Sequence, residues 1–272
     1  MRGNAKELIA AARSHGRAVP ALNVDSIDMA MGVIAAAESA RISFILQVTV
    51  ETLDIWGWQF LTRALLTLID DAHIPVVLLL DHAKQVGFVR RAIDMGFGAM
   101  MYDGSALPIS ENLARTHEVV TYARKHSTFV EGELGHVPRD GEPVEWDHLT
   151  TIKEAATYWS AAGVDALAIA IGTRHGHYRM PEDIHVERVR EIASATGAPL
   201  VLHGGSGMPE VLFSALIKAG IAKVNVGTEL RRAWWAGIDA SKGAKPREAL
   251  LAVRNTITTR VLEVIGLLAS RC

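Results

Sequence analysis

Three histidines in the chain are placed where they could hold a metal ion. His82, His175 and His203 each lie at or just beyond the carboxyl end of a short apolar segment that is typical of a buried strand. If these strands are parallel, their carboxyl ends share one rim and the three imidazoles converge there. Three imidazoles with an open fourth position form a catalytic zinc site, in which the ion acts as a Lewis acid. We therefore expect Zn²⁺ here, although iron, cobalt or manganese suits the same ligands.

Several acids are expected at the same rim. Asp103 follows a short strand, and Glu131 and Glu133 share one face of the next strand because strand side chains alternate. Either glutamate is a candidate metal ligand or a hydrogen-bond partner of a ligating histidine. Asp81 directly precedes His82, so alternation predicts that these two side chains face the site differently. We expect Asp81 to act there as a general acid or base.

Glycine-rich loops follow the last two expected strands. They are Gly204, Gly205, Ser206 and Gly207 after one strand, and Asn225, Val226, Gly227 and Thr228 after the other. Each loop leads into an expected helix, and backbone N–H groups at such a position bind phosphate well. We expect a phosphate site here; two turn-forming loops without a ligand are the alternative.

Two other chemistries compete with a metal-dependent lyase. Lys223 could form a Schiff base in place of the metal, but it lies early in its expected strand, towards the opposite end. His175 and His177 have the H-x-H spacing of some metal-dependent hydrolases, in which the motif belongs on the first strand. Both readings are therefore less favoured than the three-histidine site.

The elements that must position these residues alternate along the chain. Short runs rich in Val, Ile, Leu and Ala alternate with longer segments of helical periodicity, which predicts βα units around a parallel sheet. The expected strands are residues 18–23, 43–48, 75–81, 99–102, 128–133, 166–171, 199–203 and 222–226. Eight such units indicate an α/β fold, a (β/α)₈ TIM barrel, whose active sites lie at the carboxyl ends of the strands.

Both ends of the chain are expected to add helices to the barrel. Asn4 can cap a helix that runs through Arg13 and closes the barrel's bottom; a loosely held terminus is the alternative. After the last strand we expect a helix over 229–238, a break at 241–246 and a long final helix from 247, which suits a subunit contact. The sequence has no obvious linker, so we expect a single domain over residues 1–272.

Composition restricts the partners. The formal charge of −2 and the isoelectric point near 6.6 give no field that attracts nucleic acid or anionic lipid, so a small molecule is the expected partner. The N-terminus has no signal-peptide pattern, and the longest apolar runs are too short to cross a membrane. The single cysteine, Cys272, suits a reducing cytoplasm.

The longest irregular stretch, residues 134–147, follows the fifth expected strand. In a barrel it rises from the rim that carries the histidines, and long loops at such a place tend to be functional. We expect a mobile lid; a passive surface excursion is the alternative.

Taken together, the motifs resemble the class II, metal-dependent ketose-bisphosphate aldolases, which include the fructose- and tagatose-bisphosphate enzymes. The resemblance covers nearly the whole chain. The segments that carry it are residues 19–23, 75–82, 102–105, 130–135, 163–172, 175–176, 202–207 and 223–229. The last segment is somewhat more similar to the shorter tagatose-type branch.

The resemblance implies reversible cleavage of a ketose (bis)phosphate, such as fructose or tagatose 1,6-bisphosphate, to dihydroxyacetone phosphate and an aldehyde through a metal-stabilised enediolate. It implies that Asp81 is the proton donor and that a lid carboxylate, Asp140 or Glu142, is the base. The residues implied for metal are His82, His175 and His203, with Asp103 and Glu133 at a second divalent or monovalent cation. The residues implied for the dihydroxyacetone phosphate end are Gly176, Gly204, Gly205, Ser206, Asn225, Val226, Gly227 and Thr228, and Asn23 matches a substrate-contacting asparagine.

Three departures from the family pattern qualify this reading. Ala83 replaces the glycine that usually follows His82, and residues 137–142 replace the usual glycine pair and acids of the lid. The Asp-Pro-Arg segment, whose arginine reaches a neighbouring subunit's substrate phosphate, is shortened away near residues 241–246. Arg247 is a positional substitute. We expect phosphate recognition at the aldehyde end to be weakened, so that the aldehyde is unphosphorylated or unusual.

The altered lid leaves a second class of function open, a non-catalytic barrel that binds metal and sugar phosphate as a sensor or assembly subunit. For the enzyme, the resemblance implies a homodimer or homotetramer, and the apolar final helix is compatible with that. A role in carbohydrate metabolism such as glycolysis follows from the family.

Overall fold

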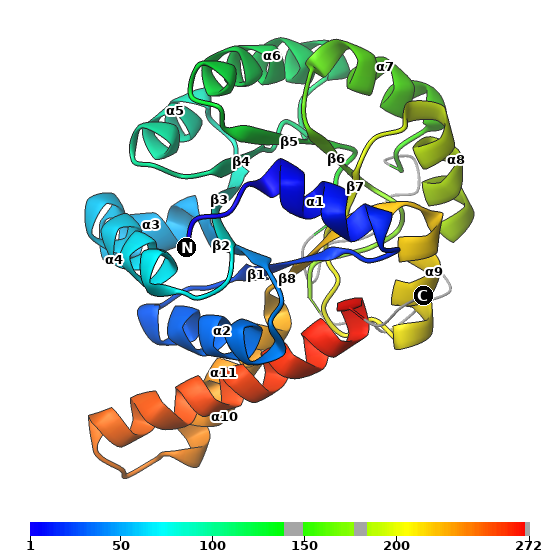
Figure 1. Ribbon diagram of the computed structural model, residues 1–272. Coiled ribbons are helices and arrows are strands. Elements are labelled where there is room, and N and C mark those ends of the chain that lie inside the picture. The colour runs from blue at the N-terminus through cyan, green and yellow to red at the C-terminus, as the bar shows by residue number, and fades with distance from the viewer. Residues whose placement is uncertain (139–148, 177–183, 270–272) are drawn as a thin grey trace.

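A closed parallel barrel forms the centre of the molecule (Figure 1). The computed structural model describes residues 1–138, 149–176 and 184–269. Eight strands pair in chain order, and β8 pairs with β1 to close the ring. The strands are β1 (Val19–Asn23), β2 (Phe44–Thr49), β3 (Val76–Ala83), β4 (Ala99–Tyr102), β5 (Phe129–Leu134), β6 (Ala166–Ile169), β7 (Leu200–Leu202) and β8 (Ile221–Val226). The expected (β/α)₈ barrel is thereby confirmed.

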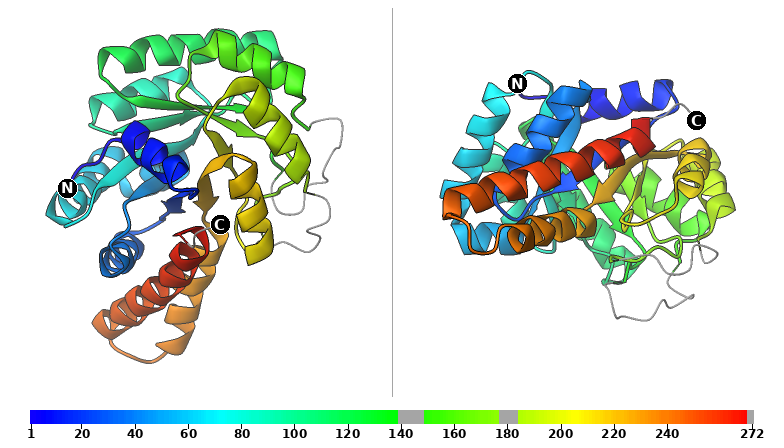
Figure 2. Two further views of the ribbon diagram at one scale, coloured as in Figure 1. Left: turned by 45° about the vertical axis from the view of Figure 1, so that its right-hand side comes forward. Right: turned by 90° about the horizontal axis from the view of Figure 1, so that it is seen from below.

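Helices surround the barrel and separate successive strands (Figures 1 and 2). Within the described ranges they are α1 (Ala5–Ser14), α2 (Ile27–Ala40), α3 (Val50–Trp56), α4 (Trp58–Asp71), α5 (Val86–Asp94), α6 (Ile109–Lys125), α7 (Ile152–Ala162), α8 (Val186–Thr196), α9 (Glu210–Ala219), α10 (Thr228–Ala240) and α11 (Pro246–Ala269). Gly57, with a φ of 82°, separates α3 from α4. None of these helices is long and apolar enough to cross a bilayer.

Apolar residues on both faces of the strands create two cores. Outward side chains pack under the helices, whereas inward side chains fill the barrel itself. Ala5 and Ile9 of α1 join the inner core. Asn4 caps this helix through its side-chain oxygen, which accepts the backbone N–H groups of Lys6 and Glu7. The helix closes the barrel's amino-terminal end, as expected, so the opposite end remains for a site.

The last two helices form a hairpin that projects from the barrel (Figure 2). The break between them is as expected, and α11 begins at Pro246, a residue favoured in a first helical turn. Helix α11 packs against α10 and α2. Gly237 and Gly32 allow this close approach, because a Cβ at Gly237 would lie 2.5 Å from the Val253 Cα, and one at Gly32 would lie 2.8 Å from the Ile257 Cγ2.

Candidate active site

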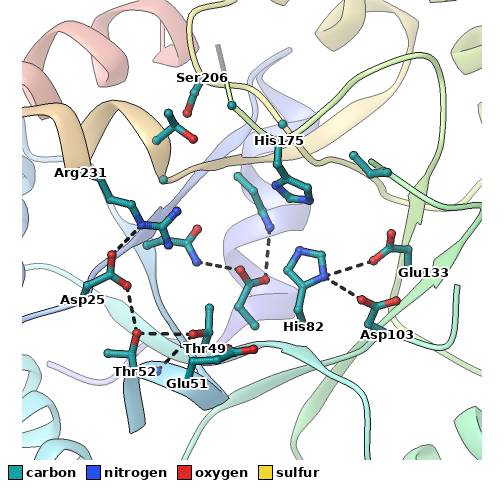
Figure 3. A pocket seen from close by; sticks show the side chains of 18 of the residues that line it. Asp25, Thr49, Glu51, Thr52, His82, Asp103, Glu133, His175, Ser206 and Arg231 are labelled. Atoms are coloured by element: carbon teal, nitrogen blue, oxygen red, sulfur yellow. Dashed lines mark hydrogen bonds and ion pairs between the residues drawn. The ribbon is translucent and has the colours of Figure 1, made fainter. Parts of the chain in front are cut away.

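Three histidine rings meet at the carboxyl end of the barrel; Figure 3 shows two of them, His82 and His175. His82 belongs to β3, His203 directly follows β7, and His175 lies in the segment after β6. Their ring centroids are 4.8 to 5.9 Å apart. Each ring offers a nitrogen within 4.8 Å of one from the others, as expected of a metal group.

Carboxylates determine which nitrogens of two of these rings face each other. Glu131 Oε1 lies 2.9 Å from His203 Nε2, and Asp103 Oδ2 lies 3.1 Å from His82 Nδ1. Each carboxylate accepts an N–H, so the remaining nitrogens, His203 Nδ1 and His82 Nε2, present lone pairs to each other at 3.1 Å. Two lone pairs at this distance repel unless a cation lies between them. The donor set therefore fits a metal ion such as zinc, or a shared proton in its absence.

A second group of possible metal ligands combines His82 with Asp103 and Glu133. Glu133 Oε2 lies 3.5 Å from His82 Nδ1 and accepts no hydrogen bond from the described part of the chain. Asp103 is oriented by Ser105, whose backbone N–H and hydroxyl both donate to its Oδ1. The same two acids can thus orient His82 or contact a second cation.

Lys223 supports the site from below. Its ammonium group is fully buried and lies 2.8 Å from Glu131 Oε2 and 2.7 Å from Asn225 Oδ1. The lysine therefore neutralises the carboxylate that orients His203. It does not line the cavity, and an ion-paired ammonium is a poor Schiff-base nucleophile, so the geometry agrees with the preference for a metal-dependent reaction.

Asp81 faces the cavity together with His82, which corrects the expectation of different orientations. His82 has a left-handed backbone with a φ of 49°, and the β3–β4 register shifts at this point. This irregularity interrupts the alternation of side chains, so neighbouring residues reach one site. Amide groups then hold Asp81: Asn23 Nδ2 donates over 2.7 Å and Gln47 Nε2 over 3.2 Å.

Burial and neighbouring charges shift the pKa values of the cluster. Burial disfavours charge on His82, but nearby carboxylates, Asp81 foremost, outweigh it and raise the His82 pKa to about 10. Burial lowers the pKa of His203. Burial and the Asp103 carboxylate raise the pKa of Glu133 well above its usual range. Without a metal, these shifts therefore favour a proton on His82, whereas His203 stays neutral and supplies a lone pair.

A cavity of about 630 Å³ opens above the histidines. It is lined by Asp81 and His82, by the acids Asp103 and Glu133, and by residues of the loops after β1, β2, β6, β7 and β8. Its volume suits a phosphorylated sugar. Gly204 needs its lack of a Cβ here, because its φ is +72° and a Cβ would overlap the Arg174 carbonyl. Gly227 caps α10 without a side-chain hydrogen bond, so the first N–H groups of that helix are available to an anion.

The expected substrate-binding residues are mostly at this cavity. Those that line it are Asn23, Gly176, Gly204, Ser206, Asn225, Gly227 and Thr228. Gly205 and Val226 do not line it; the Gly205 N–H bonds to the Asn225 carbonyl, and Val226 is buried in the outer core. The expected base residues, Asp140 and Glu142, lie outside the described residues, as does His177.

Sequence reasoning missed two parts of this site. Gln47 holds Asp81, and its signal was visible as a polar residue inside the otherwise apolar strand β2. Arg231 and Asp25 line the cavity from α10 and the loop after β1. An exposed charged residue on a helix is ordinary, so no local pattern could have singled them out.

This barrel, with histidines and acids gathered at the carboxyl ends of its strands, has the layout of a barrel enzyme. A sequence profile described as "Fructose-bisphosphate aldolase class-II" matches residues 3–271. The 6-phospho-5-dehydro-2-deoxy-D-gluconate aldolase of Shouchella clausii is 36% identical over 232 residues, which are 84% of this chain and 79% of that protein. The sulfofructosephosphate aldolase of Alkalicoccus urumqiensis is 32% identical over 251 residues, 91% and 88% of the two chains.

Solved structures agree with the sequence comparison. The crystal structure of the YdjI aldolase from Escherichia coli K12 matches with a TM-score of 0.90 and 29% identity, covering 100% of this chain and 98% of that one. The chain belongs to the class II fructose-bisphosphate aldolase family. It is therefore a lyase of the aldolase type, and the family is metal-dependent.

Proposed function

We propose that this protein reversibly cleaves a ketose phosphate to dihydroxyacetone phosphate and an aldehyde, with zinc as its metal. The observation that carries the proposal is the pair of histidine nitrogens, His203 Nδ1 and His82 Nε2, held 3.1 Å apart by carboxylates on their far sides. Together with His175, these residues would hold the ion. A bound divalent cation supplies Lewis-acid polarisation of the ketose carbonyl.

The glycine-rich loops are proposed to bind the phosphate next to the ketone. Gly176, Gly204, Ser206 and Gly227 line the cavity, and Gly227 is the N-cap residue at which α10 begins. Neutral backbone donors and the positive end of a helix stabilise a phosphate dianion.

We propose that Asp81 is the general acid and base for the hydroxyl group that becomes the aldehyde. Its carboxylate is 3% exposed, lines the cavity and accepts hydrogen bonds from Asn23 and Gln47, which keep it ionised and oriented. Nearby cationic groups outweigh the effect of burial and lower the Asp81 pKa. In cleavage Asp81 takes the proton from the hydroxyl that becomes the aldehyde, and in synthesis it returns that proton. Asp140 or Glu142 remains our proposal for the second base, and Asp103 and Glu133 remain our proposal for a second cation.

The printed names of the relatives suggest the substrate class. One describes a sugar acid with a phosphate beside a ketone and a carboxylate at the opposite end, and the other a ketose that carries both a sulfonate and a phosphate. Both carry an acid group besides the phosphate. This agrees with the expectation from the resemblance that the segment before α11 is shortened and lacks the family's arginine for a second phosphate. We propose that the aldehyde product is acidic or uncharged rather than phosphorylated, and that the enzyme is a cytoplasmic homodimer or homotetramer.

The test is release of dihydroxyacetone phosphate from fructose and tagatose 1,6-bisphosphates, from their 1-phosphates and from 6-phospho-5-dehydro-2-deoxy-D-gluconate. Each substrate is assayed before chelation, after chelation and after zinc add-back. We expect activity that disappears with chelator, returns with zinc and is greatest on a substrate without a second phosphate. Metal-replete protein that cleaves none of these substrates would overturn the proposal.

A further inference from the structure

Arg231 places a guanidinium group in the cavity wall. It lies in the first turns of α10, and its Nε lies 2.7 Å from Asp25 Oδ2. Asp25 follows β1, and its other oxygen accepts the hydroxyl of Thr52 at 3.0 Å. In Figure 3 these residues face His82 from the opposite side of the cavity. The guanidinium is thus held beside the segments that follow β1 and β2.

Only one edge of this guanidinium is used. Nε donates to Asp25 Oδ2, and within the described residues no hydrogen bond involves Nη1 or Nη2 of Arg231. About half of the side chain is exposed to solvent. A guanidinium held at one edge presents its remaining N–H groups in a planar fork, which matches the two oxygens of an acid group.

If the proposed function is correct, the position of Arg231 relative to Asp81 indicates which end of the substrate Arg231 contacts. The phosphate loops follow β6, β7 and β8, whereas Asp81 is held from β1 and β2 by Asn23 and Gln47. If Asp81 protonates the aldehyde oxygen, the rest of the aldehyde extends over β1 and β2. Arg231 reaches that side from α10, next to Gly227, because its anchor Asp25 follows β1.

The charges around Arg231 indicate which anion fits. Among the described residues of the lining, Asp25 and Glu51 are the carboxylates near Arg231, and Lys84, from the loop after β3, is the other lysine or arginine. The charges of these two acids and two basic residues cancel. An anion is therefore held here by directed hydrogen bonds rather than by the net charge of the cavity wall. A dianionic phosphate would meet the two carboxylates at greater cost than a monoanion would.

We propose that Arg231, anchored by Asp25 of the same chain, binds a singly charged carboxylate or sulfonate at the aldehyde end of the substrate. It would thereby provide, within one chain, the far-end recognition for which the family uses a neighbouring subunit's arginine.

The test is carried out in the synthetic direction, with dihydroxyacetone phosphate and a series of aldehydes on zinc-loaded protein. The aldehydes are 3-oxopropanoate, sulfoacetaldehyde, glyceraldehyde 3-phosphate and uncharged glycolaldehyde. We expect Arg231→Gln to lower kcat/KM about 10- to 100-fold for the carboxylate and the sulfonate, the size of one lost charge-assisted contact. For glycolaldehyde we expect less than about a threefold change.

Three variants serve as controls. Arg232→Gln alters the next residue of α10, which does not line the cavity, and Arg247→Gln alters the exposed arginine at the start of α11. Lys84→Gln removes the other cation. We expect none of them to discriminate between charged and uncharged aldehydes. Because Arg231 and Asp25 are both exposed by more than a third, removing their ion pair costs little stability and Arg231→Gln should fold.

Two outcomes would overturn the inference. An equal loss on all four aldehydes would place Arg231 at the dihydroxyacetone phosphate end or in the support of the fold. A carboxylate-specific loss in Lys84→Gln or Arg247→Gln, and none in Arg231→Gln, would assign the anion to another residue.

A binding experiment separates this inference from the proposed activity. 6-Phosphogluconate and sorbitol 6-phosphate share a phosphate and differ by the carboxylate, and calorimetry measures their affinities without turnover. We expect Arg231→Gln to weaken 6-phosphogluconate about 10- to 100-fold and to leave sorbitol 6-phosphate unchanged. If the wild-type protein catalyses no condensation but shows this difference, the proposed function fails and the inference about Arg231 stands. If Arg231→Gln changes the affinity for both ligands equally, the inference fails whether or not the protein has aldolase activity.

Discussion

Asp81 is the residue whose environment most directly suits a proton transfer. Its two oxygens accept amide hydrogens from Asn23, Gln47 and Asn225, and it shares the cavity with His82. The donors favour the carboxylate form, so the group can accept a proton in cleavage at neutral pH and must be supplied with one for synthesis.

Replacing Asp81 by asparagine removes this acid–base function and keeps the side-chain shape. We expect kcat to fall about 10²- to 10⁴-fold with zinc content unchanged, because a general acid or base contributes about that much. Steady-state kinetics and metal analysis check both points. Gln47→Met, which removes one donor to Asp81, should cause a smaller loss. Wild-type turnover in Asp81→Asn would contradict the assignment.

Protons and metal compete at His82. In the metal-free protein nearby carboxylates raise its pKa to about 10, although burial opposes this. At neutral pH an incoming ion must therefore displace a proton, and zinc affinity should increase about tenfold per pH unit up to about pH 10. Competition with a chromophoric chelator at several pH values measures this slope. A pH-independent affinity would show that His82 is neutral before the metal binds.

The same pKa determines how the stability of the metal-free protein changes with pH. Because the folded-state pKa of His82 exceeds the unfolded value of about 6.5, its contribution to the stability of the metal-free protein is complete below that value. It is lost as the pH rises through about 10. Denaturation of the chelated protein at increasing pH should show this decline.

At the scale of elements, the packing of α11 depends on close backbone approach. In Gly237→Ala the new Cβ would lie 2.5 Å from the Val253 Cα, a backbone atom that cannot move aside without shifting α11. We expect the free energy of unfolding to fall by about 1–3 kcal/mol, the cost of overpacking a close contact.

Gly266→Ala is the matched control, because Gly266 is exposed within α11 and a Cβ there meets no atom within 4 Å. Alanine has the higher helix propensity, so this variant should gain up to about 1 kcal/mol. Chemical denaturation of both variants gives the comparison. A loss of similar size in both would indicate that helix propensity, not the contact with Val253, determines the result.

At the scale of the whole molecule, the projecting hairpin exposes apolar surface. Trp235 of α10 and Leu250 and Leu251 of α11 are each more than half exposed. Such a group suits contact with another subunit, in agreement with the proposed homodimer or homotetramer. Light scattering should give a mass that is a multiple of 29.4 kDa.

Trp235→Asp combined with Leu251→Asp should shift that mass towards the monomer, because a charge at an apolar interface loses its hydration. Val211→Asp is the control, since Val211 is an exposed apolar residue of α9, outside the hairpin. A wild-type monomer at all concentrations would rule out the subunit contact.

The sequence by itself determined the barrel and the main residues of its site. Strand and helix periodicities are local, and eight strand–helix units have few ways to close a parallel sheet, so the order of strands followed. The three histidines and the acids lay at strand ends, and the closed barrel brings strand ends to one rim. Their proximity therefore followed from topology alone.

The tertiary structure decided what depends on exact direction and on distant neighbours. The left-handed backbone at His82 turns Asp81 into the cavity, against the alternation that the sequence predicts. Lys223 serves Glu131 because inward side chains of different strands meet inside the barrel. The pairing of Arg231 with Asp25 joins residues 206 positions apart. Such contacts arise only when the barrel closes, so no local pattern can encode them.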